Sequence, residues 1–185
     1  RNVINLFGKE FQPDAIYGYS LTISFLIVVL LSPILSSLAD TIGNKKSFLQ
    51  FFCYLGATSC MGLAMFVNMN TVFLGLLFSI TASVGFWGSL VFYNSFLPDI
   101  ATPDKQDALS AKGYVYGYIG SVILVVICLV LIMFVAQTPK QALILTRVSF
   151  LMTGAWWFGF SQYTFKHLPK FGEVKDQLPK DLVLL

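Results

Sequence analysis

The chain alternates between long apolar runs and short polar segments. Five of the apolar runs approach the length that crosses a bilayer, which is roughly 20 residues for about 30 Å of hydrocarbon. They are rich in Phe, Leu, Ile and Val and lack the sustained alternation of a barrel strand, so we expect helices. The predicted spans are 16–38, 48–67, 72–97, 114–135 and 143–165.

Composition supports the lipid bilayer as the solvent of these helices. Hydrophobic residues make up 56% of the 185 residues and charged residues 11%, and the mean hydropathy is +0.75. A soluble domain needs more charge to cover its surface. No Asp, Glu, Lys or Arg occurs between Ser47 and Pro98, and the polar triplet at 68–70 predicts a tight turn between two antiparallel helices. The expected fold is an all-α, polytopic membrane helical bundle.

The distribution of basic residues predicts the orientation of the bundle. Cytoplasmic loops carry an excess of Lys and Arg, and most lysines fall on one side of a five-span chain. We therefore expect the N-terminus of the chain outside and the C-terminus in the cytoplasm. The net charge of +3 follows from this excess and does not call for a nucleic-acid partner. The lysines on the predicted cytoplasmic side are Lys45, Lys46, Lys105, Lys112, Lys166, Lys170, Lys175 and Lys180.

An odd number of spans places the first residue outside, yet the segment before residue 13 lacks the basic and apolar regions of a signal peptide. The first residue is also Arg rather than Met. We expect that a helix precedes Arg1 and that the chain is a fragment. The alternative is a complete five-span protein whose N-terminus is outside.

Enzymatic or metal chemistry has little support in the residues. Cys53, Cys60 and Cys128 lie inside predicted spans, and no further ligands join Cys53 and Cys60 to make a metal site. His167 is the only histidine and lies in the predicted cytoplasmic tail, so no Ser-His pair can be built around it. We expect a protein that is not an enzyme and has no metal and no cofactor.

Charged residues are expected only at the ends of the spans. Asp14, Asp40, Asp99 and Arg147 all lie at or near the ends of predicted helices. Ionisable groups inside a membrane usually mark proton or ion pathways. If transport is coupled to protons, the proton carrier must therefore lie outside this chain.

The segment "SSLADTIGNKK" resembles the loop between the second and third helices of major facilitator superfamily transporters. That loop has a glycine, an acidic residue four positions later, a basic residue, a second glycine and a basic cluster. Asp40, Gly43, Lys45 and Lys46 match this pattern. The departures are Ser36 in place of the first glycine, and Thr41 and Asn44 in place of basic residues.

Other stretches resemble one branch of this superfamily, the vacuole effluxer-like proteins. They are "YGYSLTISFLIVVLLSPILSSLAD", "VFYNSFLPDIA", "SAKGYVYGYIGS" and "RVSFLMTGAWWFGFSQYTF". The resemblance covers nearly the whole chain but only the second to sixth helices of a twelve-helix fold. It implies a partial N-terminal bundle at 1–165 and the start of a cytoplasmic linker at 166–185. The first helix and the C-terminal half of the same protein would then be its partners, together with the lipid bilayer.

The resemblance implies conformational gating by the loop. In the superfamily the acid equivalent to Asp40 helps to hold the cytoplasmic side shut. Gly43 would allow a tight turn, and Lys45 and Lys46 could pair with Asp99. Alternatively, the lysines only follow the positive-inside rule. The predicted gating residues are Ser36, Asp40, Gly43, Lys45, Lys46 and Asp99.

Three glycines in the fourth predicted span, Gly113, Gly117 and Gly120, fall on one helix face. Small residues on one face allow membrane helices to approach closely. We therefore expect this face to pack against another helix. Antiporters of the superfamily have a proline where Tyr118 stands, so antiport is not inferred.

A substrate site is expected near the midplane, between the two halves of a transporter. Without interior charges, this half offers neutral hydrogen-bonding groups and aromatic rings. Each of them could instead serve hydrogen bonds between helices. The candidates are Tyr19, Ser20, Ser24, Ser89, Tyr93, Asn94, Tyr118 and Ser121.

The function predicted from these observations is secondary active transport of a small polar solute by alternating access. The resemblance implies an amino acid or a similar molecule as the solute, moved by efflux, and a bacterial cytoplasmic membrane as the location. The alternative function is a non-transporting membrane module for assembly or anchoring. A transporter requires a helix before Arg1 and a second bundle after Leu185, whereas the module does not.

Overall fold

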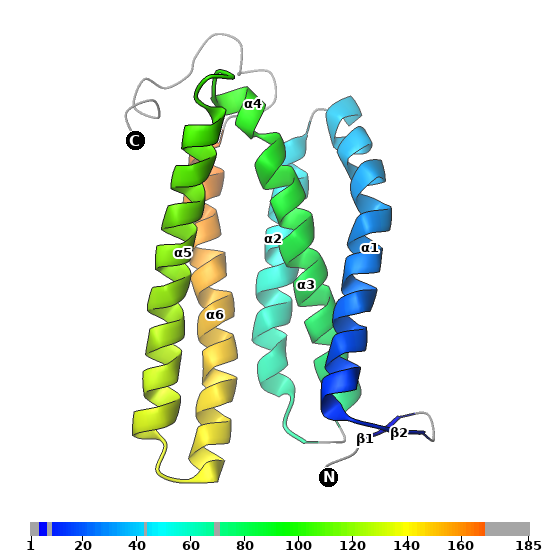
Figure 1. Cartoon of the computed structure of the whole chain (residues 1–185), viewed down its shortest axis with the longest axis vertical. Coiled ribbons are helices and arrows are strands. Elements are labelled where there is room, and N and C mark those ends of the chain that lie inside the picture. The colour runs from blue at the N-terminus through cyan, green and yellow to red at the C-terminus, as the bar shows by residue number, and fades with distance from the viewer. Residues whose placement is uncertain (1–3, 7–8, 43, 69–70, 169–185) are drawn as a thin grey trace.

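The computed structural model of the chain describes residues 4–6, 9–42, 44–68 and 71–168. In this part, five long helices lie side by side and alternate in direction (Figure 1). They are α1 (Pro13–Ile42), α2 (Lys45–Gly62), α3 (Val72–Ser95), α5 (Gln106–Val130) and α6 (Pro139–His167). Shorter elements are α4 (Leu97–Ile100), a 3-10 turn at Leu63–Met65 after α2 and a π-helical turn at Leu131–Val135 after α5.

A small antiparallel hairpin precedes α1, which the all-α prediction did not include. It consists of β1 (Ile4–Leu6) and β2 (Lys9–Phe11). The ring of Phe11 meets the ring of Tyr19 edge-on, with centroids 6.5 Å apart, so the hairpin is attached to the second turn of α1. We call this end of the bundle the hairpin end, and the opposite end, where α4 lies, the α4 end (Figure 1).

All five long helices are long and apolar enough to cross a membrane, which confirms the predicted number of spans. Four of the five helices begin earlier than predicted, because their polar first turns are also helical. The difference is largest for α5, which begins at Gln106 rather than 114, and for α6, which begins at Pro139 rather than 143. The hydroxyl of Thr138 accepts a hydrogen bond from the backbone N–H of Gln141 at 3.2 Å. This N-cap, followed by proline at the first helical position, fixes the start of α6.

The buried core lies where α2 packs between α3 and α6. Phe92 is only 1% exposed and stacks on Phe48 and Phe52, with ring centroids 5.3 Å and 5.7 Å away. Two glycines bring α2 and α3 together: a Cβ atom on Gly85 would lie 2.5 Å from the Cα of Gly56. The buried residues of this core are Leu49, Phe52, Cys53, Val84, Phe92, Phe96 and Phe165.

Many apolar side chains outside this core are exposed on the surface of the bundle. Leu124 is the buried residue of α5, and on α1 the side chains of Val29 and Leu30 are 65% and 69% exposed. Such a surface matches hydrocarbon rather than water. Together with the five spans, it identifies the chain as a multi-pass membrane protein.

Candidate functional site: the α4 end and the polar residues of the spans

The α4 end contains an ion pair between α2 and the segment that follows α3. Lys45 lies in the first turn of α2, and its Nζ atom is 3.1 Å from Oδ2 of Asp99 in α4. The same Nζ donates to the backbone carbonyl of Ser95, at the end of α3, at 3.4 Å. The contact between Lys45 and Asp99 is the one that the sequence predicted.

Lys46 binds a different helix. Its Nζ donates to the backbone carbonyl of Leu168 at 2.8 Å, just after the end of α6. The expected pairing of Lys46 with Asp99 is therefore wrong. Cations are unfavourable in the first turn of their own helix but favourable at the C-terminal end of another. The two lysines of α2 thus reach the C-terminal ends of α3 and α6.

The remaining gating candidates are less completely described. Asp40 lies in the last turn of α1, but its side chain is outside the described part of the chain, as is the whole of Gly43. Ser36 is half-buried on α1. The proposed gating by these residues stays a prediction.

A double-mutant cycle on the Lys45–Asp99 pair, with Lys45→Met and Asp99→Asn, is expected to give a coupling energy of about 0.2–1 kcal/mol. The side chains are 24% and 31% exposed, so water and salt screen the charges. Thermal unfolding of the purified protein at low and high salt measures this coupling. Lys105→Met, in the exposed loop before α5, is the control. A coupling that salt does not reduce would contradict the assignment as a screened pair.

Three of the predicted substrate residues are buried and bonded within their own helices. Ser20, Ser24 and Ser89 are 3%, 1% and 8% exposed. Their hydroxyls donate to backbone carbonyls one turn earlier, at 2.8 Å, 2.7 Å and 2.8 Å. A serine bonded in this way satisfies its own hydroxyl. Neither a ligand nor another helix is needed to explain these serines.

The other predicted substrate residues are exposed and lie at different depths. Tyr93 and Asn94 lie in the last turn of α3, near the α4 end. Tyr19 lies in the second turn of α1, near the hairpin end. Tyr118 and Ser121 lie near the middle of α5, and Tyr118 is 69% exposed. These residues do not form one substrate site at a single depth in the described part of the chain. A substrate site at the midplane therefore stays a prediction.

The three glycines of α5 meet different surroundings. A Cβ on Gly113 would lie 2.5 Å from the hydroxyl of Tyr93, so α3 and α5 touch at this point. A Cβ on Gly120 would be 4.0 Å from Nε1 of Trp156, and Gly117 has nothing within 4 Å. Close packing along the whole glycine face stays a prediction.

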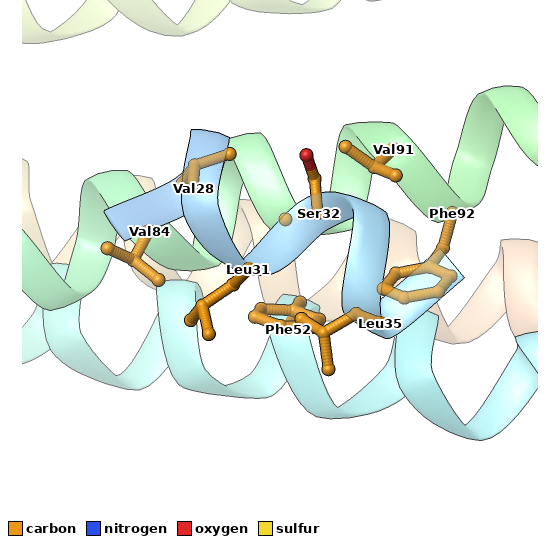
Figure 2. Close-up of a pocket in the computed structure, with 9 residues that line it drawn as sticks. Val28, Leu31, Ser32, Leu35, Phe52, Val84, Val91 and Phe92 are labelled. Atoms are coloured by element: carbon orange, nitrogen blue, oxygen red, sulfur yellow. The ribbon is translucent and has the colours of Figure 1, made fainter. Parts of the chain in front are cut away.

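Figure 2 shows a narrow hollow between α1, α2 and α3. Its volume of about 10 Å³ is near the lower limit for one water molecule. Ser32 is the lining residue with a polar side chain, so the hollow does not suit a polar solute (Figure 2). The lining residues are Val28, Leu31, Ser32, Leu35, Phe52, Val84, Gly88, Val91 and Phe92.

A wider, open groove runs between α5 and α6, with a volume of about 730 Å³. Its lining is almost entirely apolar and includes the small residues Ala155 and Gly159. Small residues four positions apart favour the approach of another membrane helix. The lining residues are Leu124, Ile127, Met152, Ala155, Trp156, Gly159, Phe160 and Tyr163.

Sequence reasoning missed one charged contact between helices. Nε of Arg147 in α6 donates to the backbone carbonyl of Ala64 at 2.6 Å. In the segment "TPKQ" at 138–141, Thr138 and Gln141 have the spacing of a capping box, which could have placed the start of α6 earlier and Arg147 deeper. The predicted span placed Arg147 four residues from its start, whereas α6 begins eight residues before Arg147.

Five membrane-length helices around a core of α2, α3 and α6 define a polytopic α-helical membrane protein. The model of the vacuole effluxer Atg22-like family matches residues 1–184, so the chain belongs to this family. The resemblance stated from the sequence is thereby confirmed. No solved structure matches the chain.

Similar proteins come from bacteria and fungi. The chain is 37% identical over 168 residues to the uncharacterized MFS-type transporter YxiO of Bacillus subtilis. The match covers 90% of the chain and 39% of that protein. It is 35% identical over 104 residues to autophagy-related protein 22 of Coccidioides immitis, covering 56% of the chain and 17% of that protein. The chain thus spans less than two fifths of the length of these relatives.

Proposed function

We propose that this chain is the partial N-terminal bundle of a major facilitator transporter and supplies its second to sixth helices. The observation that carries the proposal is the family match over residues 1–184, joined by the similarity to an MFS-type transporter. The open apolar groove between α5 and α6 supports it, because a further helix of the same protein would cover such a surface. Residues 1–165 would form the bundle, and 166–185 the start of the linker to the second half.

In this proposal the protein works by alternating access, in which two helical halves rock about a central site. The lysines at the start of α2 hold the C-terminal ends of α3 and α6, so these three helices move as one body. Asp40 contacts the second half and keeps the cytoplasmic side closed. The α4 end would face the cytoplasm of a bacterial cell, and the hairpin end the outside.

The proposed solute is a small polar molecule such as an amino acid, moved by efflux. The direct test reconstitutes the full-length protein in liposomes and follows a panel of labelled amino acids. Uptake or release that depends on the protein supports the proposal. A protein that inserts and remains folded but moves none of them favours the alternative, a membrane module for assembly or anchoring.

Replacing Asp40 by Asn in the full-length protein is expected to slow transport by about tenfold, with normal expression. The carboxylate biases the equilibrium between the two access states, and a coupling of this kind is typically worth about 1–3 kcal/mol. Initial rates in liposomes measure the effect. Asp104→Asn, in the exposed loop before α5, is the matched control. Equal rates for Asp40→Asn and the wild type would remove the gating role.

A further inference from the structure

Arg147 lies inside a membrane span rather than at its end. The α6 helix begins at Pro139, eight residues earlier, which places the Cα of Arg147 about 12 Å along the helix axis. Among the Asp, Glu, Lys and Arg residues in the five described spans, Arg147 is the farthest from a span end. A charge at such a position is costly unless the side chain reaches the membrane interface, and it often marks a functional site.

The guanidinium of Arg147 is held in one orientation by the end of α2. Its Nε donates to the carbonyl of Ala64 at 2.6 Å, and Ala64 is 8% exposed. This carbonyl belongs to the last turn after α2, where helix carbonyls have no partner within the helix. The bond satisfies a buried acceptor, and Nε is the guanidinium nitrogen bonded within the described part of the chain.

The charge of Arg147 has no counter-ion in the part of the chain that the structure describes. In the described residues, Arg147 is bonded to the Ala64 carbonyl and not to a carboxylate. The ion pair between Lys45 and Asp99 lies at the other end of the bundle. Arg147 is only half-buried. A guanidinium anchored through Nε presents a planar fork of N–H donors, which matches the oxygens of a carboxylate or phosphate.

The depth of Arg147 in the membrane decides whether its guanidinium can reach an anion at the membrane surface or one at the midplane. The 29 residues of α6 span about 43 Å, and about 30 Å of this lies in hydrocarbon. If α6 is centred, about 6–7 Å projects at each end, and the Cα of Arg147 lies about 5–6 Å below the hydrocarbon boundary. Helical side chains lead back toward the N-terminal end, so the guanidinium reaches the headgroup level.

We propose that Arg147, anchored on the Ala64 carbonyl, binds the phosphate of a phospholipid in the leaflet at the hairpin end. The site lies between α6 and the end of α2, where both helices are already in contact. The phosphate supplies the missing counter-charge, and the lipid thereby stabilises the outer contact between α2 and α6. This inference does not depend on transport, and its test does not measure transport.

The test titrates lipids into the delipidated full-length protein and follows bound lipid by native mass spectrometry. Dioleoylphosphatidylglycerol is compared with dioleoylglycerol, which has the same tails and no phosphate, and with inorganic phosphate alone. We expect the wild type to retain the phospholipid in preference to the other two. Arg147→Gln should lose affinity for it by about tenfold or more, because the charge-assisted fork is removed.

Two further variants keep the test informative. Lys140→Gln removes an exposed cation at the same end of α6 and should bind the phospholipid like the wild type. Arg147→Lys keeps the charge without the fork, so its affinity should fall between those of the wild type and Arg147→Gln. If Arg147→Gln does not fold, the phospholipid affinity of Arg147→Lys tests the proposal in its place.

Three outcomes would overturn the proposal. The first is equal retention of the two lipids by the wild type. The second is equal phospholipid affinity in the wild type and in the Arg147 variants. The third is binding of inorganic phosphate as tight as that of the lipid, which would assign the site to a free anion.

Discussion

Replacing Gly85 by alanine is expected to destabilise the bundle by about 2 kcal/mol or more, although alanine is the better helix former. The added Cβ would lie 2.5 Å from the Cα of Gly56 and 2.9 Å from the carbonyl oxygen of Phe52. Both are backbone atoms of α2, so no side chain can rotate away. The two helices must move apart, and the stacked rings of Phe52 and Phe92 must separate with them. Thermal unfolding in detergent, followed by helical circular dichroism, measures the loss.

Gly159→Ala is the matched control for this prediction. Gly159 is also a helix glycine, but it lines the open groove, and a Cβ there would have nothing within 4 Å. The helix propensity of alanine should then act alone and stabilise the protein by up to about 1 kcal/mol. The two variants are thus expected to differ in sign. Equal melting temperatures for Gly85→Ala and the wild type would contradict the close contact between α2 and α3.

The number and type of the long elements could be predicted because the bilayer imposes a length on each apolar run. The predicted starts were less accurate, since four of the five helices begin with polar turns, most clearly α5 and α6. The α5 helix begins at Gln106, before its apolar run. The α6 helix likewise begins at Pro139, before the apolar run of that span. Apolar length therefore identifies a span, whereas the capping residues around Thr138 identify where its helix begins.

The ion pair at the α4 end could be predicted only in part. Lys45 and Asp99 have opposite charges and lie at the ends of consecutive spans on one side of the membrane, so their pairing could be predicted. The two side chains are in contact. Lys46 was expected to do the same, but neighbouring residues on a helix do not face the same direction. Lys46 therefore reaches the end of α6 instead. Its acceptor is a backbone carbonyl, and such acceptors carry no sequence signature.

The polar residues of the spans show why hydroxyl groups are weak evidence for a site. Ser20, Ser24 and Ser89 were candidates because neutral hydroxyl groups can hydrogen-bond a polar solute. Each of these hydroxyls instead donates to a backbone carbonyl one turn earlier in its own helix. Arginine cannot satisfy itself in this way, because its five donors and its charge exceed what one carbonyl offers. Arg147 is therefore the more informative polar residue within the spans.

Replacing Trp157 by alanine is expected to cost about 2–3 kcal/mol of unfolding free energy, less than for a fully buried aromatic side chain, because Trp157 is half-buried. The ring of Trp157 lies against Gly56 of α2 and meets the ring of Phe86 edge-on, with centroids 6.1 Å apart. It therefore fills the space between α6 and the closely packed α2–α3 pair. Its loss leaves a cavity that the glycine on the opposite side cannot fill. Thermal unfolding of the purified chain in detergent measures the effect.

The neighbouring Trp156 is the control, since it has the same size and lies in the same turn of α6. Its ring lines the open groove and contacts Phe160, with centroids 4.9 Å apart, so it faces the surface instead of α2. In the isolated chain, Trp156→Ala should change stability by less than about 1 kcal/mol, because this half-buried ring lines an open groove. In the full-length protein the same substitution should cost more if another helix covers the groove, because Trp156 is then buried. An equal cost for both tryptophans in the isolated chain would contradict the packing of the Trp157 ring against α2.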